Sequence, residues 1–477
     1  MFWSLVNRMC NAMGRLPLVG GTFLGLGFAR AWLGWILGTG CDAAAFPALG
    51  PLHAQLLVDI GEIVGFFALS LYAYLRGPVY RRGLVVVGSP FLLVLATVGA
   101  CLNLTEALPT PMVVAALIAG GLGYAGMLVL WLELFGCLNP RRMLIAWSGS
   151  YLIAFALWPL YANLDFIAMG AFVGLLPCVS IVCFVAAHRS LDPERLPDSE
   201  GAKSAQRVPW TYVGAIVVFV FALNFGDVVA EVQTYSWMSR IGMVVVEIAV
   251  LMVALLCASV FDVRHLLTAL PVVSGTGFAL MVLTQNEGWV PGVLFGASSE
   301  ICLLLLYAVG CALAYRLHRT SAFLCGLLAG VYKIALQLGK WAGAACVSAP
   351  WWSETQHAWL CAGAVLVTAF AAVVLMRNPN LIEQLSWDRS NAKPSNMGLS
   401  EIAKRYGLTD RESAVLSLLA EGASTADIAD EFVCAQSTVR AHTSNIYRKL
   451  DVHSRTELLD LLGANRRQTC KKARVLQ

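Results

Sequence analysis

The sequence predicts an all-α protein: a twelve-helix transmembrane bundle followed by a small four-helix soluble domain. Three observations predict this fold class. Of the 477 residues, 58% are hydrophobic and 13% are charged, whereas soluble proteins have about 25% charged residues. Long apolar runs recur through residues 1–376. After Arg377 the composition becomes polar, and apolar residues then recur at helical spacing.

The first part of the chain is predicted to be a polytopic membrane domain, residues 1–376. A helix needs about 20 mostly apolar residues to cross a bilayer. Twelve such runs are separated by links rich in Pro, Gly, Asn or charge, which break helices. The first run lacks a signal-cleavage pattern after it and is expected to remain a helix. The runs are 17–38, 54–76, 83–102, 111–135, 143–162, 166–187, 209–230, 237–260, 265–284, 289–315, 321–346 and 357–376.

Lys and Arg in the links predict the orientation, because basic links stay in the cytoplasm. Every second link contains neither residue: 39–53, 103–110, 163–165, 231–236, 285–288 and 347–356. The other links and the flanking segments carry Arg8, Arg15, Arg76, Arg81, Arg82, Arg141, Arg142, Arg189, Arg195, Lys203, Arg207, Arg264, Arg316, Arg319 and Arg377. This alternation predicts a multi-pass protein of a bacterial cell (inner) membrane, with both termini in the cytoplasm.

Six spans, a longer polar link from about Arg189 to Pro209, and six more spans form a layout that resembles the major facilitator superfamily. The resemblance covers residues 1–376 and rests on layout. In the link "LRGPVYRRGL", Gly77, Arg81 and Arg82 match a motif that transporters of this superfamily often carry, but its Asp is missing. The resemblance implies a bundle of two six-helix halves.

Several ionisable residues are expected at membrane depth, where such side chains usually face a cavity or a partner. Two interpretations stay open: structural ion pairs that hold the bundle together, or a polar cavity that binds an unknown small molecule or ion. The candidates are Arg30, Asp59, Glu62, Asp227, Arg240, Glu247, Glu300 and Lys333. The first five lie in the first two spans of each half at similar depth, which suits an internal repeat.

The sequence carries no motif for catalysis or metal binding. It lacks a nucleophile elbow, a Gly-rich phosphate loop and a Cys/His cluster with zinc spacing. Many of the 14 cysteines lie inside apolar runs, where a thiol acts as a small buried hydrophobe. We therefore expect no catalytic residue, no metal site and no cofactor, and a protein that is not an enzyme.

The soluble end begins with a polar segment, 377–398, which is predicted to be a linker, and it ends with a basic tail, 466–477. The region between them, 399–465, is predicted to contain four helices. Thr409 and Glu412 form a capping box at the start of one helix. The next helices are expected at 425–432, from about 437 to 450, and at about 455–462.

The helices at 425–432 and 437–450, joined by the tight turn "VCAQ", form a helix-turn-helix. The outer face of the later helix is polar and basic, with Thr438, Arg440, His442, Thr443, Ser444, Asn445, Arg448 and Lys449. The run "LTDRESAVLSLLAEGASTADIADEFVCAQSTVRAHTSNIYRKLDVHSRTELL" resembles the LuxR-type DNA-binding domain over about 60 residues. The matching positions include Leu408, Thr409, Arg411, Glu412, Gly422, Ile428, Ser437, Thr438, Val439, Arg440, His442, Asn445, Ile446, Lys449, Leu450 and Val452.

This resemblance implies a set of contacts with double-stranded DNA. Arg440, Ala441 and Ser444 lie on the side where family members meet base edges, and the expected phosphate contacts are Thr438, His442, Asn445, Lys449 and Arg455. Family members usually dimerise through the last helix, which implies a homodimer contact around Leu458, Leu459 and Leu462. The alternative is a helical protein-interaction module with a basic face.

Together, the two parts predict a membrane-embedded one-component transcriptional regulator that senses a small molecule or membrane signal and binds DNA. Its expected partners are double-stranded DNA, the lipid bilayer and an unknown small-molecule ligand. The competing interpretation is a secondary transporter with a C-terminal regulatory DNA-binding domain. A third interpretation, in which the spans only anchor the reader, is weakened by the charges at membrane depth, since one or two spans would suffice for an anchor.

Overall fold

A computed structural model gives the fold of the chain. It describes residues 21–38, 51–104, 108–138, 140–191, 210–231, 238–256, 263–283, 289–316, 320–349, 354–376 and 406–450, with Leu399, Ala403, Val452, Arg455 and Leu458 as single residues. The predicted linker 377–398 and basic tail 466–477 lie outside these residues. The chain separates into two compact units, which we call the membrane unit, up to Trp387 apart from three residues, and the C-terminal unit, Asp388–Gln477.

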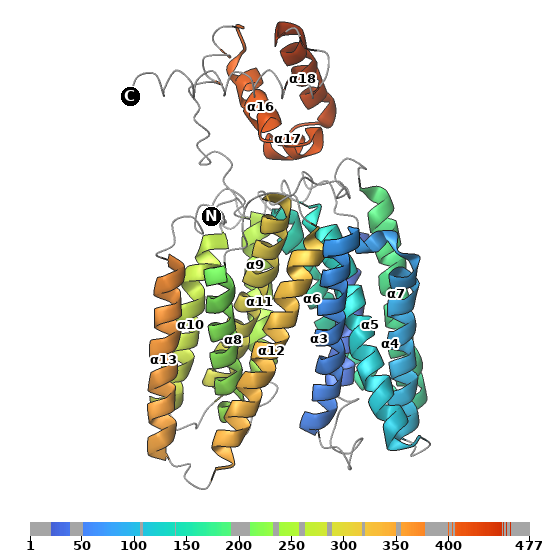
Figure 1. Ribbon diagram of the computed structural model, residues 1–477, viewed down its shortest axis with the longest axis vertical. Coiled ribbons are helices and arrows are strands. Elements are labelled where there is room, and N and C mark those ends of the chain that lie inside the picture. The colour runs from blue at the N-terminus through green and yellow to red at the C-terminus, as the bar shows by residue number, and fades with distance from the viewer. Residues whose placement is uncertain are drawn as a thin grey trace. The chain divides into compact units, whose positions relative to one another are not determined.

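The membrane unit is built from apolar helices (Figure 1). Two short 3-10 helices also lie in it, η1 (Gly21–Leu24) and η2 (Val79–Arg81). In the part of the chain that the structure describes, the twelve α-helices of this unit are α2 (Leu26–Leu37), α3 (Pro51–Arg76), α4 (Gly83–Leu104), α5 (Thr110–Gly136), α6 (Pro140–Ala162), α7 (Phe166–Ser190), α8 (Trp210–Glu231), α9 (Met238–Leu256), α10 (Val263–Leu283), α11 (Val290–Arg316), α12 (Ser321–Val347) and α13 (Glu354–Met376). Each coincides with a predicted apolar run.

Ten of these helices are long and apolar enough to cross a membrane. In the described residues, α2 has 12 residues and the apolar part of α13 is Ala358–Val373, so both fall short of that length. Large apolar side chains such as Leu84, Ile167 and Phe370 point outward, which is the arrangement expected of a surface that faces lipid. The membrane unit is therefore a multi-pass bundle, while the count of twelve spans stays a prediction.

The two halves of the bundle, α2–α7 and α8–α13, repeat the same packing. In the first half α3 packs on α5, α4 packs on α5 and α7, and α2 packs on α6 and α7. The corresponding helices of the second half pack in the same pairs: α9 on α11, α10 on α11 and α13, and α8 on α12 and α13. The same order of contacts in both halves is what an internal repeat produces.

Glycines bring the second and fourth helices of each half into close contact. A Cβ on Gly121 of α5 would clash with the backbone carbonyl of Val58 on α3. In the second half, a Cβ on Gly296 of α11 would clash with the carbonyl of Ser239 on α9. Small residues at membrane helix crossings allow such backbone contact. The two crossings therefore both have a glycine at the point of contact, on the fourth helix of each half.

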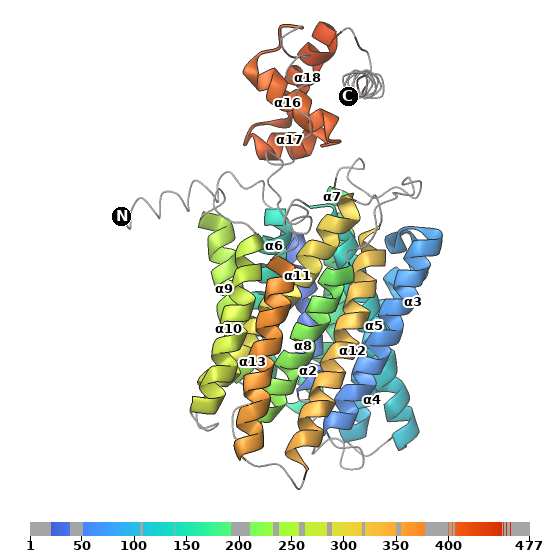
Figure 2. The same ribbon diagram turned by 60° about the vertical axis from the view of Figure 1, so that its left-hand side comes forward.

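The halves meet along two further helix pairs, α3 with α12 and α6 with α9. Each pair joins the second helix of one half to the fifth helix of the other, so the interface has approximate two-fold symmetry. In Figure 1 the helices of the second half lie on the left and those of the first half on the right, and the turned view shows α12 beside α3 (Figure 2). The ion pairs of Lys333 on α12 with Asp59 and Glu62 on α3 lie at this interface.

The C-terminal unit contains three described α-helices: α16 (Asp410–Ala420), α17 (Thr425–Glu431) and α18 (Gln436–Leu450). Their bounds agree with the predicted helices to within about two residues. Val415, Leu416, Leu419, Ile428, Val439, Ile446 and Leu450 form a shared apolar core. These side chains recur at helical spacing, and their burial holds the three short helices together.

Candidate functional site

The helix-turn-helix is fixed by capping boxes at the start of its supporting helices. At α16, the Glu412 amide donates to Thr409 Oγ1 at 3.2 Å and the Thr409 amide donates to Glu412 Oε2 at 2.9 Å. This confirms the predicted box. Ser424 and Asp427 form a second box at α17, with the equivalent bonds at 3.2 and 3.1 Å. A serine followed three residues later by Asp is a weaker signal than the Ser/Thr–Glu signature, so this second box was not predicted from the sequence.

The turn between α17 and α18 sets the angle between these two helices. Val433 in this turn has φ 51°, in the left-handed region that few β-branched residues occupy. The Cys434 amide closes the turn with a hydrogen bond to the Ala429 carbonyl at 2.9 Å. With Val439 and Ile446 buried on the inner side, α18 turns its opposite face to solvent.

The exposed face of α18 carries the predicted base-reading residues. Thr438, Arg440, Ala441 and Ser444 are exposed, and His442 and Asn445 are half-buried. Arg440, Ser444 and Arg448 follow one another at intervals of four residues, so they share a face of the helix. Thr443, also predicted for this outer face, instead is buried and donates to the Val439 carbonyl at 2.9 Å.

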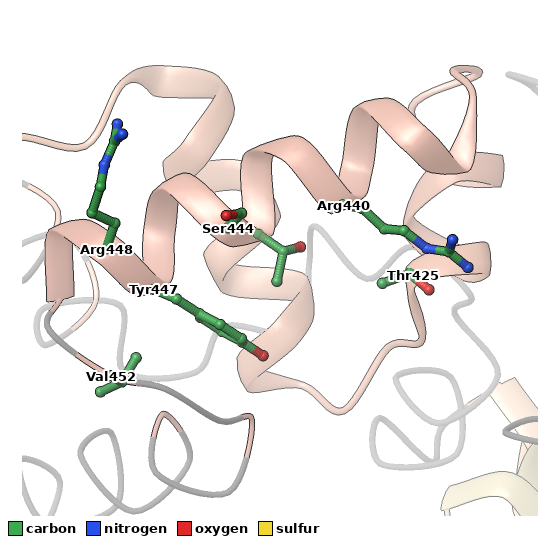
Figure 3. A pocket seen from close by; sticks show the side chains of 7 residues that line it. Thr425, Arg440, Ser444, Tyr447, Arg448 and Val452 are labelled. Atoms are coloured by element: carbon green, nitrogen blue, oxygen red, sulfur yellow. The ribbon is translucent and has the colours of Figure 1, made fainter.

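Arg440 and Ser444 line an open pocket of about 520 Å³. The other lining residues are Thr425, Thr443, Tyr447, Arg448 and Val452. Figure 3 shows the Arg440 side chain reaching toward Thr425 of α17, while the Tyr447 ring lies farther along α18. Tyr447 and Thr425 were absent from the predicted contact set, although Tyr447 is one turn beyond Thr443 and could have been found from helical spacing.

Two predicted phosphate contacts already bind groups of their own unit. Lys449 Nζ donates to Glu412 Oε2 at 2.7 Å and to the Gly407 carbonyl at 3.0 Å. The Lys449 ammonium, with the Thr409 amide, lowers the pKa of Glu412 to about 2. Arg455 donates from Nη2 to the Ala423 carbonyl at 2.9 Å. Both side chains therefore also brace the unit.

The predicted dimer contact involves the end of the C-terminal unit. Leu458 is fully buried in the core shared with α16 and α18. It is therefore a core residue of its own unit and presents no surface to a second copy. Leu459 and Leu462 lie outside the described residues.

In the membrane unit, Lys333 of α12 joins two acidic residues of α3. Its Nζ lies 2.7 Å from Asp59 Oδ1 and 2.9 Å from Glu62 Oε2. Gln337, one turn further along α12, also donates to Asp59. Since α3 belongs to the first half and α12 to the second, this ion-pair cluster crosses the interface between the halves.

A second group of predicted residues lies on α2, α9 and α11. The Arg30 guanidinium lies 3.7 Å from the ring centroid of Trp147, and it donates to the Trp147 carbonyl at 3.4 Å. The Trp147 indole in turn donates to Glu300 Oε1 at 3.5 Å. Glu247 is fully buried, and Glu300 and Arg30 are among the charges that act on it.

The remaining two candidates are Arg240 and Asp227. Arg240 is exposed near the start of α9, within electrostatic range of Tyr161. Asp227 is half-buried in α8. The structure thus brings together Asp59, Glu62 and Lys333, and separately Arg30, Glu247 and Glu300.

The C-terminal unit matches a known family. Residues 407–462 match the family described as bacterial regulatory proteins, luxR family. The chain is 41% identical over 68 residues to the uncharacterized response regulatory protein YgeK of Escherichia coli, covering 13% of this chain and 46% of YgeK. It is 38% identical over 78 residues to the Fimbriae Z protein of E. coli, covering 16% and 35%. The chain thus spans less than half the length of these relatives.

The membrane unit resembles solved transporter structures in fold. The human organic anion transporter MFSD10 matches with a TM-score of 0.52 and 13% identity, over 76% of this chain and 99% of that one. A bacterial homologue of the iron transporter ferroportin matches with a TM-score of 0.53 and 14% identity, over 76% and 98%. At such low identity the likeness shows the fold alone. Residues 407–462 are therefore a luxR-family DNA-binding domain, carried by a chain whose membrane unit resembles major facilitator transporters in fold.

Proposed function

We propose that the chain is a membrane-embedded, one-component transcriptional regulator. In this proposal residues 399–465 fold as the DNA reader, residues 377–398 link it to the membrane domain, residues 1–376, and residues 466–477 are a basic tail. The observation that carries the proposal is the exposed face of α18, with Arg440, Ser444 and Arg448 in one row on a braced helix-turn-helix. A helix of this kind enters the major groove of DNA.

Within that groove, we assign base contacts to Arg440, Ala441 and Ser444. An Arg guanidinium offers two parallel donors that match the O6 and N7 acceptors of guanine. Ala441 and Ser444 are small and exposed, so they admit the base edges without adding a strong preference. We therefore expect Arg440 to dominate base selection.

Phosphate contacts are assigned to Thr438, His442, Asn445, Lys449 and Arg455. The Lys449 ammonium has three hydrogens, and the structure uses two of them, on Glu412 and Gly407. The third hydrogen is available to a phosphate oxygen. Arg455 likewise keeps further N–H groups beyond its bond to Ala423. Both residues would then hold the helix and bind the backbone at once.

A second copy of the chain is the proposed partner on DNA. A single helix-turn-helix reads few base pairs, and dimers read two half-sites about one helical turn apart. Because Leu458 is buried in its own unit, we assign the two-fold contact to Leu459 and Leu462 alone. Replacing both by Ser should lower the cooperativity of binding to a paired half-site.

We further propose that the membrane unit senses a small molecule or membrane signal at the interface of its halves. The support is the position of the charges: Lys333 with Asp59 and Glu62, and Glu300 with Trp147, each join helices of different halves. A ligand that binds one arrangement of the halves better than another shifts their balance. The shift would reach the reader through α13 and the linker.

The proposed location is the inner membrane of a bacterium with both termini in the cytoplasm. This places the reader in the compartment that contains DNA, and the alternating basic and base-free links support it.

The test of the regulator uses the full-length chain in lipid nanodiscs. Arg440→Ala should weaken DNA binding by about 1–3 kcal/mol and relax base preference. Arg189→Ala, which removes the same charge from the exposed end of α7 in the membrane unit, is the matched control and should bind like the parent. Equal binding by parent and Arg440→Ala would remove α18 as the reader.

A transporter with a regulatory DNA-binding domain is the second candidate, and the transporter fold of the membrane unit favours it. Uptake of candidate substrates into sealed vesicles separates the two. Movement of a substrate that also changes DNA binding would establish the transporter, whereas a ligand that alters DNA binding without being moved would establish the sensor.

A further inference from the structure

Two acidic side chains are buried deep in the second half of the bundle. Glu247 of α9 and Glu300 of α11 have 0% and 2% of their surface exposed. Neither makes an ion pair with a Lys or Arg within the described residues, in contrast to Asp59 and Glu62, which share Lys333. Both oxygens of Glu247 lack a hydrogen-bond partner among the described groups, and so does the buried hydroxyl of Ser148 nearby.

The titratable and polar groups around this pair come from several helices. From α11 comes Glu300 itself, from α2 comes Arg30, and from α6 come Ser148 and Tyr151. Tyr124 of α5 and Tyr332 of α12 lie within electrostatic range of Glu300. On α9 itself the nearest basic residue is Arg240, which is exposed at the helix start. Arg30 is the interior cation that acts on Glu247, while Lys333 of α12, which acts on the same tyrosines as Glu300, is bound to Asp59 and Glu62.

Arg30 is itself engaged elsewhere. Its guanidinium lies on the Trp147 ring at 3.7 Å and donates to the Trp147 carbonyl. With both carboxylates ionised, the group of Glu247, Glu300 and Arg30 would carry one uncompensated negative charge. An unpaired charge in a low-dielectric interior costs several kcal/mol, and two close carboxylates resolve this by retaining one proton between them.

We propose that Glu247 and Glu300 form a protonation site that holds one proton next to the interface of the two halves, and that the proton is the signal to which the membrane unit responds. This rests on the proposed function, because the response is meaningful only if the membrane unit controls a DNA reader. Protonation converts one carboxylate to a carboxylic acid that donates to the other carboxylate. Deprotonation returns that proton to water and leaves two carboxylates.

The change of charge acts across the interface. Glu247 and Glu300 belong to the second half, whereas Arg30, Trp147 and Ser148 belong to the first. Losing the proton doubles the negative charge that faces Arg30, and this favours an arrangement in which the guanidinium leaves Trp147 and pairs with a carboxylate. Gaining the proton favours the present arrangement. The site therefore supplies the differential interaction that a switch between two arrangements needs.

Infrared spectroscopy of the full-length chain in lipid tests the proton directly. The spectrum of the parent minus that of Glu247→Gln/Glu300→Gln, taken at neutral pH, should contain the carbonyl band of one protonated carboxyl group. Asp59→Asn is the matched control, because Asp59 is buried but paired with Lys333, and its difference spectrum should contain carboxylate bands alone. Only carboxylate bands for the Glu247/Glu300 pair would overturn the proposal. If the double variant does not reach the membrane, each single Gln variant takes its place.

The response is tested by DNA binding of the same full-length chain at a series of pH values. We expect the affinity of the parent to change by about 5-fold or more as the site titrates, and that of Glu247→Gln/Glu300→Gln to stay constant. A parent affinity independent of pH, with DNA binding intact, would overturn the proton as the signal. Absence of DNA binding at every pH would instead overturn the proposed function, while the infrared result would still decide the protonation site.

Discussion

At the scale of single residues, Glu412 links the two ends of the DNA-binding fold. Its carboxylate caps α16 through the Thr409 amide and pairs with Lys449 of α18 at 2.7 Å. One buried carboxylate thus holds the first described helix of the unit to the proposed reading helix. The orientation of α18 depends on the charge of this group.

The first prediction concerns acid. The Lys449 hydrogen bond and the Thr409 amide lower the pKa of Glu412 to about 2, from an ordinary value of 4.5. Since the folded value lies below the unfolded one, the pair stabilises the fold above pH 4.5, and this contribution is lost as the pH falls from 4.5 through about 2. Denaturant unfolding of residues 399–477 should show that loss. Glu412→Gln should be less stable at neutral pH and less sensitive to acid, whereas Asp410→Asn, at an exposed position, should keep the parent's acid dependence.

At the scale of elements, backbone conformation in the turn and close contact in the bundle decide how helices cross. The turn before α18 places a β-branched residue, Val433, at φ 51°. The crossings of α3 with α5 and of α9 with α11 leave no room for a side chain at Gly121 or Gly296. Both features make a helix angle depend on one residue.

Val433→Gly is expected to stabilise the C-terminal unit. A left-handed conformation costs an L-residue about 1–2 kcal/mol, which glycine avoids, while glycine loses about 0.5–1 kcal/mol through chain entropy. A net gain of up to about 1 kcal/mol in the free energy of unfolding follows. The reverse change at a position of the same kind, Gly422→Ala at φ 89°, should destabilise the unit. Destabilisation by Val433→Gly would mean that the exposed valine makes a contact worth more than the strain.

Gly121→Ala is expected to destabilise the membrane unit. The added Cβ clashes with the Val58 carbonyl, a backbone atom that cannot move without shifting α3. Overpacking of this kind costs about 1–3 kcal/mol. The melting temperature of the purified chain in detergent should fall. Gly88→Ala in α4, where a Cβ meets nothing within 4 Å, is the control and should leave it unchanged or higher. Equal melting temperatures for the two variants would contradict the close crossing.

At the scale of the whole membrane unit, the charge clusters tie the halves together. Lys333 of the second half bonds to Asp59 and Glu62 of the first, and these three residues are largely buried. The pair of helices involved, α3 and α12, is one of the two main contacts between the halves. This cluster therefore bears on how readily the halves separate.

Lys333→Met should strongly destabilise the membrane unit, because it leaves two buried carboxylates unpaired. Breaking a buried ion pair in this way costs about 3–5 kcal/mol. The triple change Asp59→Asn/Glu62→Gln/Lys333→Met should recover most of the loss, since no charge remains unpaired. Thermal unfolding in detergent measures both. A triple variant as unstable as Lys333→Met would show that packing of the Lys333 stem, rather than charge, holds the halves.

Topology is the last prediction. Reporter fusions after Gly50, Thr110 and Glu354 should report the outside, and fusions after Arg82, Ser199 and Arg319 the inside, because the basic links are retained in the cytoplasm. The matched sites on either side serve as controls for each other. Two fusions that report the opposite side would exclude twelve spans with both ends in the cytoplasm.

Much of the fold could be derived from the sequence alone, because the signals are local. The apolar runs place every membrane helix, since each span needs about 20 apolar residues in succession. The Thr409–Glu412 capping box is formed by residues only three positions apart. The helical period of 3.6 residues distinguishes the buried face of α18 from its exposed face. The family of the C-terminal domain follows from such a contiguous stretch. These properties depend on neighbours along the chain, so no tertiary structure is needed to see them.

Contacts between residues far apart in the sequence depend on the tertiary structure. Lys333 and Asp59 are separated by 274 positions, and no periodicity relates them. The sequence grouped Arg30 with Asp59 and Glu62, but the fold places Arg30 on Trp147 and gives the two acids to Lys333. The fold also buries Leu458 and brings Lys449 into contact with Glu412. A charged residue in an apolar run predicts that the side chain has a partner. Which residue is that partner depends on how the helices of the two halves cross.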